Sequence, residues 1–387
     1  MTQDFDTHLS SIVKSHRFSI MKWESRAIPR QAKQRIFGRH EKIDDEVRVV
    51  TEYASTIERI KTLESEIKAV NAGNKPGDLA SLETELNMLR EQKTAVKNTV
   101  EKIVEKQIKK TLAQQGIFNP IDRYIRLRIN FPPLNFTLEE PPHLLVISPR
   151  DRIESIRQIV LQPNINLKEI EDIEAGVDKL GVSSLVVELG GLGATYPTLV
   201  TDEASLRFII DTATEEWLHH YLVFKPLGFL YLLDSIGVSR NYEIAVINET
   251  VASMVSKEIG AIVVENYYPQ YENGDHQAQI AGAEFDFNRE MRTVRRIVDS
   301  YLAQGEIEQA EEFMEQKRQY LASKGYYIRK LNQAYFAFYG TYADSPTSIS
   351  PIGLELKKLR SQSTSLKEFL DRVAAMTSRQ DLIESIK

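Results

Sequence analysis

The chain of 387 residues contains no cysteine, and this absence excludes several classes of site. Disulfide bridges, iron–sulfur clusters, cysteine-ligated zinc and thiol nucleophiles all require a cysteine side chain. The sequence also lacks an apolar run approaching the ~20 residues that a transmembrane helix needs. No segment near the start has the apolar core of a secretory signal. We therefore expect no transmembrane segment and a cytoplasmic location.

A surplus of basic side chains is also absent, because 49 Lys and Arg stand against 55 Asp and Glu, a net charge of −6. This balance predicts no nucleic-acid partner. The motifs Gly-x-x-x-x-Gly-Lys-Ser/Thr and Gly-x-Ser-x-Gly are missing, and Gly191-Leu-Gly193 lacks the third glycine of a dinucleotide fingerprint. A phosphate-binding loop, a serine-hydrolase elbow and a dinucleotide fold are thereby excluded.

Residues 45–116 are rich in Glu, Lys and Leu, and their apolar positions follow coiled-coil spacing. The break at 71–78 is dense in turn residues, and Asp78 is a good N-cap for a second helix. We therefore predict two antiparallel helices over 47–115. Their exposed stripe offers a surface for a second copy of the chain or for a protein partner. The segment before them, 14–42, holds nine Lys or Arg against two Glu and receives no assignment.

Short strand patterns replace the helical pattern between residues 124 and 200. Side chains alternate over 125–129, which is typical of a half-buried strand, and apolar runs at 144–147 and 184–189 indicate two buried strands. Beyond residue 202 the helical period returns. We expect helices at 203–222, 241–258, 285–303, 306–323, 326–339 and 365–375.

These patterns predict an α+β fold that is predominantly α. The coiled-coil hairpin belongs to an N-terminal helical region, 1–116. A second domain, 117–387, follows it and divides into a small β-containing part, 117–200, and a helical C-terminal part, 201–387.

The segment 212–222 is the most informative for chemistry, because two adjacent glutamates precede two adjacent histidines. On a helix, Glu215 and His219 lie one turn apart on one face, and Glu216 lies beside them. This is the layout of the zincin motif His-Glu-x-x-His, in which residues i and i+4 bind zinc and the intervening Glu activates water. In this chain Glu215 occupies the first ligand position.

A second helical segment, thirty residues beyond His219, carries Asn248-Glu249 followed by the small Ala252. With these two motifs, the region 180–340 resembles the gluzincin metallopeptidases, whose third ligand is a Glu in a later Asn-Glu-x-x-Ala helix. The strand at 184–189 and the Gly-rich turn after it are similar to the edge strand that binds the substrate backbone in that family.

The resemblance implies a gluzincin-like unit that hydrolyses peptide bonds. By position, it makes Glu216 the general base, and His219 and Glu249 the metal ligands. Glu215 then stands where the family has its first histidine ligand. The implied cofactor is zinc, and the implied partner is a peptide or protein substrate.

Glu215 changes the electrostatics of such a site. Two ligating carboxylates neutralise a divalent cation, so its bound water is less acidic than in a site with one carboxylate. Two oxygens and one nitrogen also shift the preference from zinc toward harder metals such as manganese or iron. Two functions follow: a zinc-dependent metallopeptidase, or a catalytically inactive relative that acts as a scaffold through its helical hairpin. Glu215 favours the scaffold, whereas the presence of Glu216 and Glu249 favours the enzyme.

The same helix allows a different kind of metal site. Glu216-x-x-His219 is also half of a di-iron carboxylate motif. That site needs a second Glu-x-x-His helix, and the other instance, Glu140-Pro-Pro-His143, does not fit a helix. His220 faces away from Glu216, and we expect a structural or supporting role for it.

A carbonyl-polarising donor is the remaining part of a zincin site, and it is a Tyr, His or Arg. Tyr327 and Arg329 are the candidates for this role. The tyrosines at 335, 339 and 342 invite the same role, but the aromatic cluster at 335–339 is expected to pack in the core.

Overall fold

The computed structural model describes residues 3–37, 45–120, 129–271 and 285–387, and the structural statements below concern these ranges. Within them the fold is α+β and predominantly α, with two small sheets of three strands each. The predicted strand at 125–129 lies outside these ranges except for its last residue. No helix of the described residues is long and apolar enough to cross a membrane.

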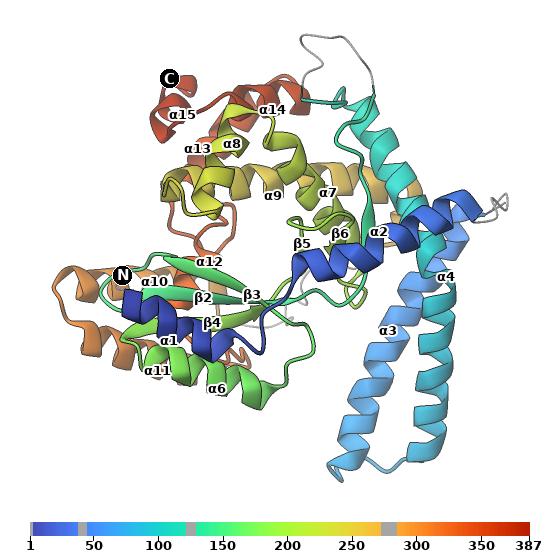
Figure 1. Cartoon of the computed structure of the whole chain (residues 1–387), viewed down its shortest axis with the longest axis horizontal. Helices are drawn as coiled ribbons and strands as arrows, with labels where there is room; N and C mark the ends of the chain where they lie inside the picture. Colours follow the sequence, from blue (N-terminus) through green and yellow to red (C-terminus); the bar gives the residue numbers. More distant parts are fainter. Residues whose placement is uncertain (1–2, 38–44, 121–128, 272–284) are drawn as a thin grey trace.

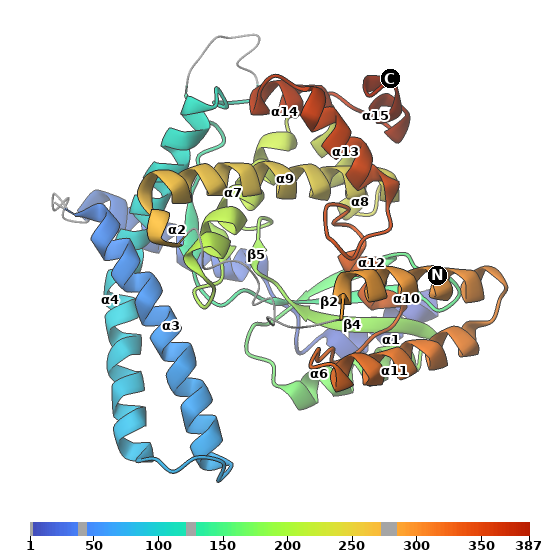
Figure 2. The same ribbon diagram turned by 180° about the vertical axis from the view of Figure 1, so that it is seen from behind.

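The predicted helical hairpin is present and extends away from the rest of the molecule (Figures 1 and 2). It consists of α3 (Glu46–Asn71) and α4 (Leu79–Gln114). Asp78 caps α4 by accepting a hydrogen bond from the Ala80 N–H at 3.1 Å. In the connection, Gly73 has a φ of 73°, a conformation that glycine adopts at little cost.

The hairpin is buried differently at its two ends. At the tip, Ile60, Leu63 and Leu86 form a small cluster between the two helices alone. At the base, side chains such as Tyr53 and Ile108 belong to the main core of the molecule, which they share with α7 and α9. This core contains residues from both sides of position 116, and the division of the chain there stays a prediction.

The six strands of the described residues form two separate sheets. One sheet has the order β1-β6-β5, with β1 (Phe136–Leu138) parallel to β6 (Thr198–Val200), and β5 (Gly191–Leu192) antiparallel to it. The other is antiparallel with the order β3-β2-β4 and consists of β3 (Arg157–Leu161), β2 (His143–Pro149) and β4 (Val182–Glu188). The strands predicted at 144–147 and 184–189 are β2 and β4.

Both faces of the second sheet are covered. On one face, α6 (Leu167–Asp178) and α1 (Gln3–Val13) bury an apolar cluster against β2 and β3. On the other face, α12 (Gln333–Tyr339) packs over Val146 and Val187. β4 forms one edge of this sheet.

Part of the basic segment 14–42 contributes to this sheet. The Phe18 N–H donates to the Val160 carbonyl at 3.0 Å, which extends the sheet beyond β3. α2 (Ile20–Phe37) follows, and its Glu24 side chain accepts a hydrogen bond from the Tyr196 N–H at 2.9 Å. The first half of α2 therefore contacts the loop between β5 and β6.

The C-terminal part is helical, as expected, but the pattern at 326–339 is wrong over its first half. Asn332 begins α12, because its side chain accepts the Tyr335 N–H at 2.9 Å while its amide donates to the Ser184 carbonyl at 2.8 Å. The helices expected elsewhere are α7 (Leu206–Leu222), α9 (Tyr242–Tyr267), α10 (Phe287–Ala303), α11 (Ile307–Ser323) and α14 (Leu366–Ala374). Helices that the sequence patterns do not predict are α1, α2, α6, α8 (Pro226–Ser235), α13 (Pro351–Gln362) and α15 (Arg379–Ser385).

Candidate metal centre

Two helices that pack side by side, α7 and α9, bring the predicted ligands together. Glu215 and His219 lie one turn apart on α7, and Glu249 lies on α9. One possible ligand atom from each of these three residues lies within 4.8 Å of the others. The His219 Nε2 atom is 3.7 Å from Glu249 Oε2, and both side chains are mostly buried, with exposed fractions of 16% and 12%. The close approach of the helices requires Gly260, because a Cβ there would lie 1.7 Å from Asp211 Oδ1.

The His219 ring is oriented by two neighbours. Its Nδ1 lies 2.9 Å from the Asn248 side-chain oxygen and donates to it, which leaves Nε2 directed toward Glu249. Tyr231 stacks against the ring, with centroids 5.6 Å apart, and its hydroxyl donates to Glu249 Oε1. A neutral imidazole with Nε2 available is the form that binds a metal.

Glu216 lies against the glycine-rich segment 190–193, which contains β5. The Gly193 N–H donates a hydrogen bond to its carboxylate. A Cβ at Gly191 would lie 2.8 Å from Glu216 Oε1, and one at Gly193 would lie 2.4 Å from Oε2, so both positions require glycine. His220 donates from Nε2 to the Gly193 carbonyl. Two side chains of α7 therefore hold the two polar groups of Gly193, the residue that follows β5.

Burial and like charges dominate the electrostatics of this centre. Burial raises the pKa of Glu216 to about 7, with a further increase from Glu249 and a decrease from His219. Burial raises the pKa of Glu215 well above its ordinary value, and the charges of Glu249 and Glu216 add to this effect. Lys257 opposes it, but its ammonium is 2.6 Å from Asp344. Three carboxylates thus share a buried site with little positive charge, which is the environment that a divalent cation neutralises.

Tyr342 lies close to the same carboxylates. The residues on either side of it are bonded to Thr250, which accepts the Ala343 N–H at 2.9 Å and donates to the Thr341 carbonyl at 3.4 Å. The charge of Glu249, followed by burial, raises the pKa of Tyr342 well above its ordinary value. Its phenol therefore stays protonated and can donate a hydrogen bond.

The structure does not bring Tyr327 and Arg329 to this centre. Tyr327 is 86% exposed to solvent. The Arg329 guanidinium forms two bonds to the Glu174 carboxylate, at 2.6 and 2.8 Å, in the β-containing part. Sequence reasoning gave no role to Tyr231, which contacts both His219 and Glu249. The only signal for Tyr231 is its polar tip within the apolar run 227–233 of α8.

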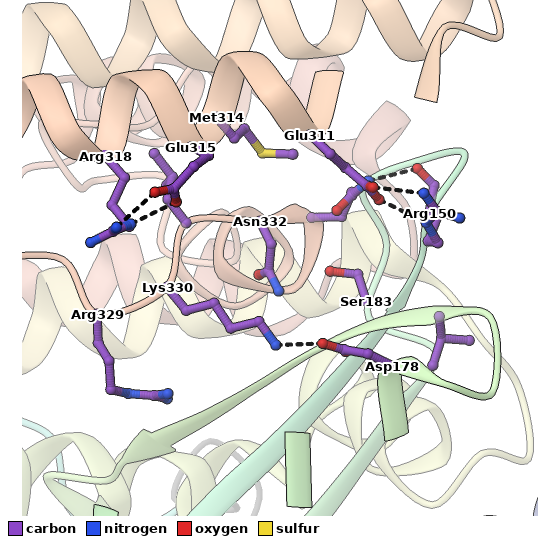
Figure 3. Close-up of a pocket in the computed structure, with 13 residues that line it drawn as sticks. Arg150, Asp178, Ser183, Glu311, Met314, Glu315, Arg318, Arg329, Lys330 and Asn332 are labelled. Carbon is purple, nitrogen blue, oxygen red and sulfur yellow. Dashed lines mark hydrogen bonds and ion pairs between the residues drawn. The ribbon is translucent and has the colours of Figure 1, made fainter. Parts of the chain in front are cut away.

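A cavity of about 590 Å³ lies elsewhere, between α11 and β4 (Figure 3). Cations and carboxylates alternate in its lining, and they pair: Arg318 lies 2.7 Å from Glu315, and Lys330 lies 2.8 Å from Asp178. None of the residues of the metal centre lines it. The cavity is therefore separate from the metal centre, and both the β-containing part and the helical C-terminal part line it.

Comparison with known proteins gives no further guidance, because no protein-family model, curated protein or solved structure matches this chain. The resemblance to gluzincins rests on the two motifs and stays a prediction.

Proposed function

We propose that this protein is a metal-dependent hydrolase of peptide bonds. Glu215, His219 and Glu249 are the metal ligands, and Glu216 is the general base. The observation that carries the proposal is the convergence of three ligand atoms within 4.8 Å of one another, with Glu216 adjacent to one of them in the chain.

The donor set fits a divalent cation. Catalytic zinc sites have three protein ligands from His and carboxylate side chains and keep one position open for water or substrate. The two carboxylates make manganese or iron the second choice. When bound, such a cation supplies Lewis-acid polarisation of the peptide carbonyl. The buried negative charge of Glu215 and Glu249 favours occupancy, since the cation removes the cost of burying them together.

The protein's own side chains supply the remaining chemistry. Glu216 accepts a proton from the attacking water and passes it to the leaving amine, and a pKa near 7 suits both transfers. The Gly193 N–H holds this carboxylate in place. Asn248 fixes the His219 tautomer, and the Tyr342 phenol is the donor for the developing oxyanion.

A second candidate function is a non-catalytic scaffold that binds a partner through α3 and α4. The projection of this hairpin from the body favours it (Figure 2). Met88 near the tip is 51% exposed. This candidate makes no demand on the metal centre and predicts no hydrolysis by any metal-loaded form.

Metal content tests the centre, and hydrolysis by the metal-loaded protein decides between the two candidates. We expect purified protein, dialysed against zinc, manganese or iron and then freed of excess metal, to retain one metal measurable by elemental analysis. Glu215→His adds a nitrogen ligand and removes a negative charge next to the metal, so zinc affinity should rise by about tenfold or more. Casein hydrolysis should rise with it.

Glu243→His is the matched control, because it makes the same exchange near the start of α9, where Glu243 pairs with Arg379 at 3.1 Å. If Glu215→His binds no more zinc than this control, while circular dichroism shows an intact fold, then Glu215 is not a ligand and the proposal is wrong.

A further inference from the structure

Backbone groups along the free edge of β4 differ in whether they have partners. In an antiparallel pair, successive residues direct their N–H and C=O groups alternately toward the partner strand and away from it. Leu185 and Val187 face β2, so Ser184, Val186 and Glu188 direct theirs outward. These outward groups are the ones to which another extended chain can pair.

Both outward groups of Ser184 are occupied. Its N–H donates to the Asp178 carboxylate at 2.9 Å, and its carbonyl accepts from the Asn332 amide at 2.8 Å. Lys330 in turn binds Asp178 at 2.8 Å (Figure 3). The segment before α12 thus runs along this part of the edge.

Both outward groups of Val186 are occupied in the same way. Its N–H donates to Glu174 at 2.6 Å, and its carbonyl accepts from Arg329 at 3.0 Å. Glu174 is only 3% exposed, and Arg329 completes a two-bond pair with it. A peptide can therefore not pair with β4 at Val186 without displacing a buried ion pair.

The edge is open where it reaches the metal centre. Glu188 is exposed, and none of the described residues bonds to its outward N–H or C=O. Only a few residues further, Gly191 and Gly193 lie against Glu216. Blocking a sheet edge, as at Ser184 and Val186, protects the protein from aggregation. Protection from aggregation does not explain why the edge is open at Glu188, the end next to the general base.

We infer that the substrate is a peptide chain end, and this inference rests on the proposed function. A substrate strand that adds to β4 at Glu188 gains backbone hydrogen bonds. β4 ends at Glu188, three positions before Gly191, which is ~10 Å of chain at 3.3 Å per residue. Beyond that point Arg329 and Glu174 block the pairing. The fragment released on this side of the scissile bond is therefore short, with one to about three residues.

The test is the mass of the products formed by the metal-loaded full chain. The substrates are a short and a long unstructured peptide of the same repeating sequence, each with free ends, with an acetylated amino end, or with an amidated carboxyl end. We expect fragments of one to about three residues from both lengths, released from the one end of the peptide that binds along β4. The blocked peptides identify that end.

Opening the edge should lengthen the products. Arg329→Ala frees the Val186 carbonyl but leaves the buried Glu174 carboxylate without its arginine. The double variant Glu174→Gln with Arg329→Ala removes that charge as well, so that the protein can fold and be tested. We expect both to shift the product masses toward longer fragments. Arg360→Ala is the control, because Arg360 likewise holds a carboxylate by two bonds, from Glu258, and one backbone carbonyl, from Ser363. It should leave the masses unchanged.

The outcomes separate this inference from the proposed function. Cleavage in the middle of the long peptide by the unaltered protein overturns the chain-end inference and leaves the peptidase proposal in place. Unchanged products from the folded double variant also overturn the inference. Absence of all cleavage by protein that has bound metal overturns the proposed function, and the inference with it.

Discussion

The hairpin tip and the metal centre are both built from two helices packed side by side, but they bury opposite kinds of side chain. At the hairpin tip, the buried residues between α3 and α4 are aliphatic, and the charged residues form exposed pairs such as Arg90 with Glu64 at 2.6 Å. Between α7 and α9 the facing residues include the Glu215 and Glu249 carboxylates, and the Glu216 charge acts on Glu215 from beside them. The hairpin tip follows the rules of a stable fold, in which apolar side chains are buried and charged ones are exposed. The α7–α9 pair departs from them at one point, and such departures occur where a protein binds or reacts.

The comparison is sharpest when one buried glutamate of the metal centre is exchanged. Glu216→Gln should lower hydrolysis of casein by about 10² to 10⁴-fold, because it removes the general base. Metal content should stay unchanged, since Glu216 is not a ligand. Elemental analysis and product release measure the two effects.

The control for this exchange is Glu64→Gln on the hairpin, which should leave both quantities as they are. Loss of metal in Glu216→Gln would mean that Glu216 is a ligand, and its separate role as general base would be wrong.

A break in the hairpin should act on stability and spare the metal centre. Leu89→Pro interrupts α4 beside the tip cluster and should cost about 3 kcal/mol of helix stability. Leu89→Ala separates the loss of side-chain packing from the loss of the helix. Circular dichroism and urea unfolding measure the effect. If the proline variant also lost its metal with the body still folded, the two regions would be coupled.

The base of the hairpin provides an intermediate case, because Glu101 is buried there but has partners. It accepts the Leu138 N–H at 2.8 Å and the Thr137 hydroxyl at 3.1 Å. Burial nevertheless raises its pKa from 4.5 to about 7. A raised carboxyl pKa favours the folded state fully below pH 4.5, and this contribution is lost as the pH rises through 7.

Glu101→Gln removes this titration, so the free energy of unfolding should depend less on pH between about 4.5 and 7. The expected difference across that window is about 2 to 3 kcal/mol. Urea unfolding at both limits measures it. Equal pH dependence in the variant and the parent would mean that Glu101 is not the group responsible.

The smallest effect is expected from the exposed charges of the tip. Arg90→Ala removes the pair with Glu64 and should change the free energy of unfolding by less than about 1 kcal/mol. High salt should change the parent by a similar amount. A larger loss, of the size expected for Leu89→Pro, would show that the tip depends on its surface charges as well as on its apolar cluster.

Sequence reasoning succeeded where a single periodic pattern determines the structure. The spacing of apolar side chains was sufficient for the hairpin, and the turn residues around Asp78 were sufficient for its connection. The i, i+4 spacing of Glu215 and His219 placed both on one face of α7. These features depend on neighbours in the chain and on no distant contact.

The rest of the site depends on contacts between distant segments. Tyr231 and Tyr342 reach the centre from segments with no motif, the latter because Thr250 bonds to the residues beside it. Arg329 was a candidate for the carbonyl-polarising donor, but its actual partner, Glu174, lies 155 positions away in the chain, where no local pattern indicates it. The helix expected at 326–339 was predicted to begin too early for the same reason. Asn332 bonds to β4, a distant contact that the local pattern does not indicate.

The grip of Glu216 and His220 on Gly193 has a kinetic consequence. The position of the base is set by Gly193, just after β5, as well as by its own helix, so a small shift of Gly193 moves the hydrogen bond that orients the carboxylate. Gly193→Ala should therefore lower kcat and leave metal content and KM close to those of the parent. Changes among the ligands would instead lower metal occupancy. Gly193 and the ligands on the helices can thus be told apart, because Gly193 governs kcat and the ligands govern metal occupancy.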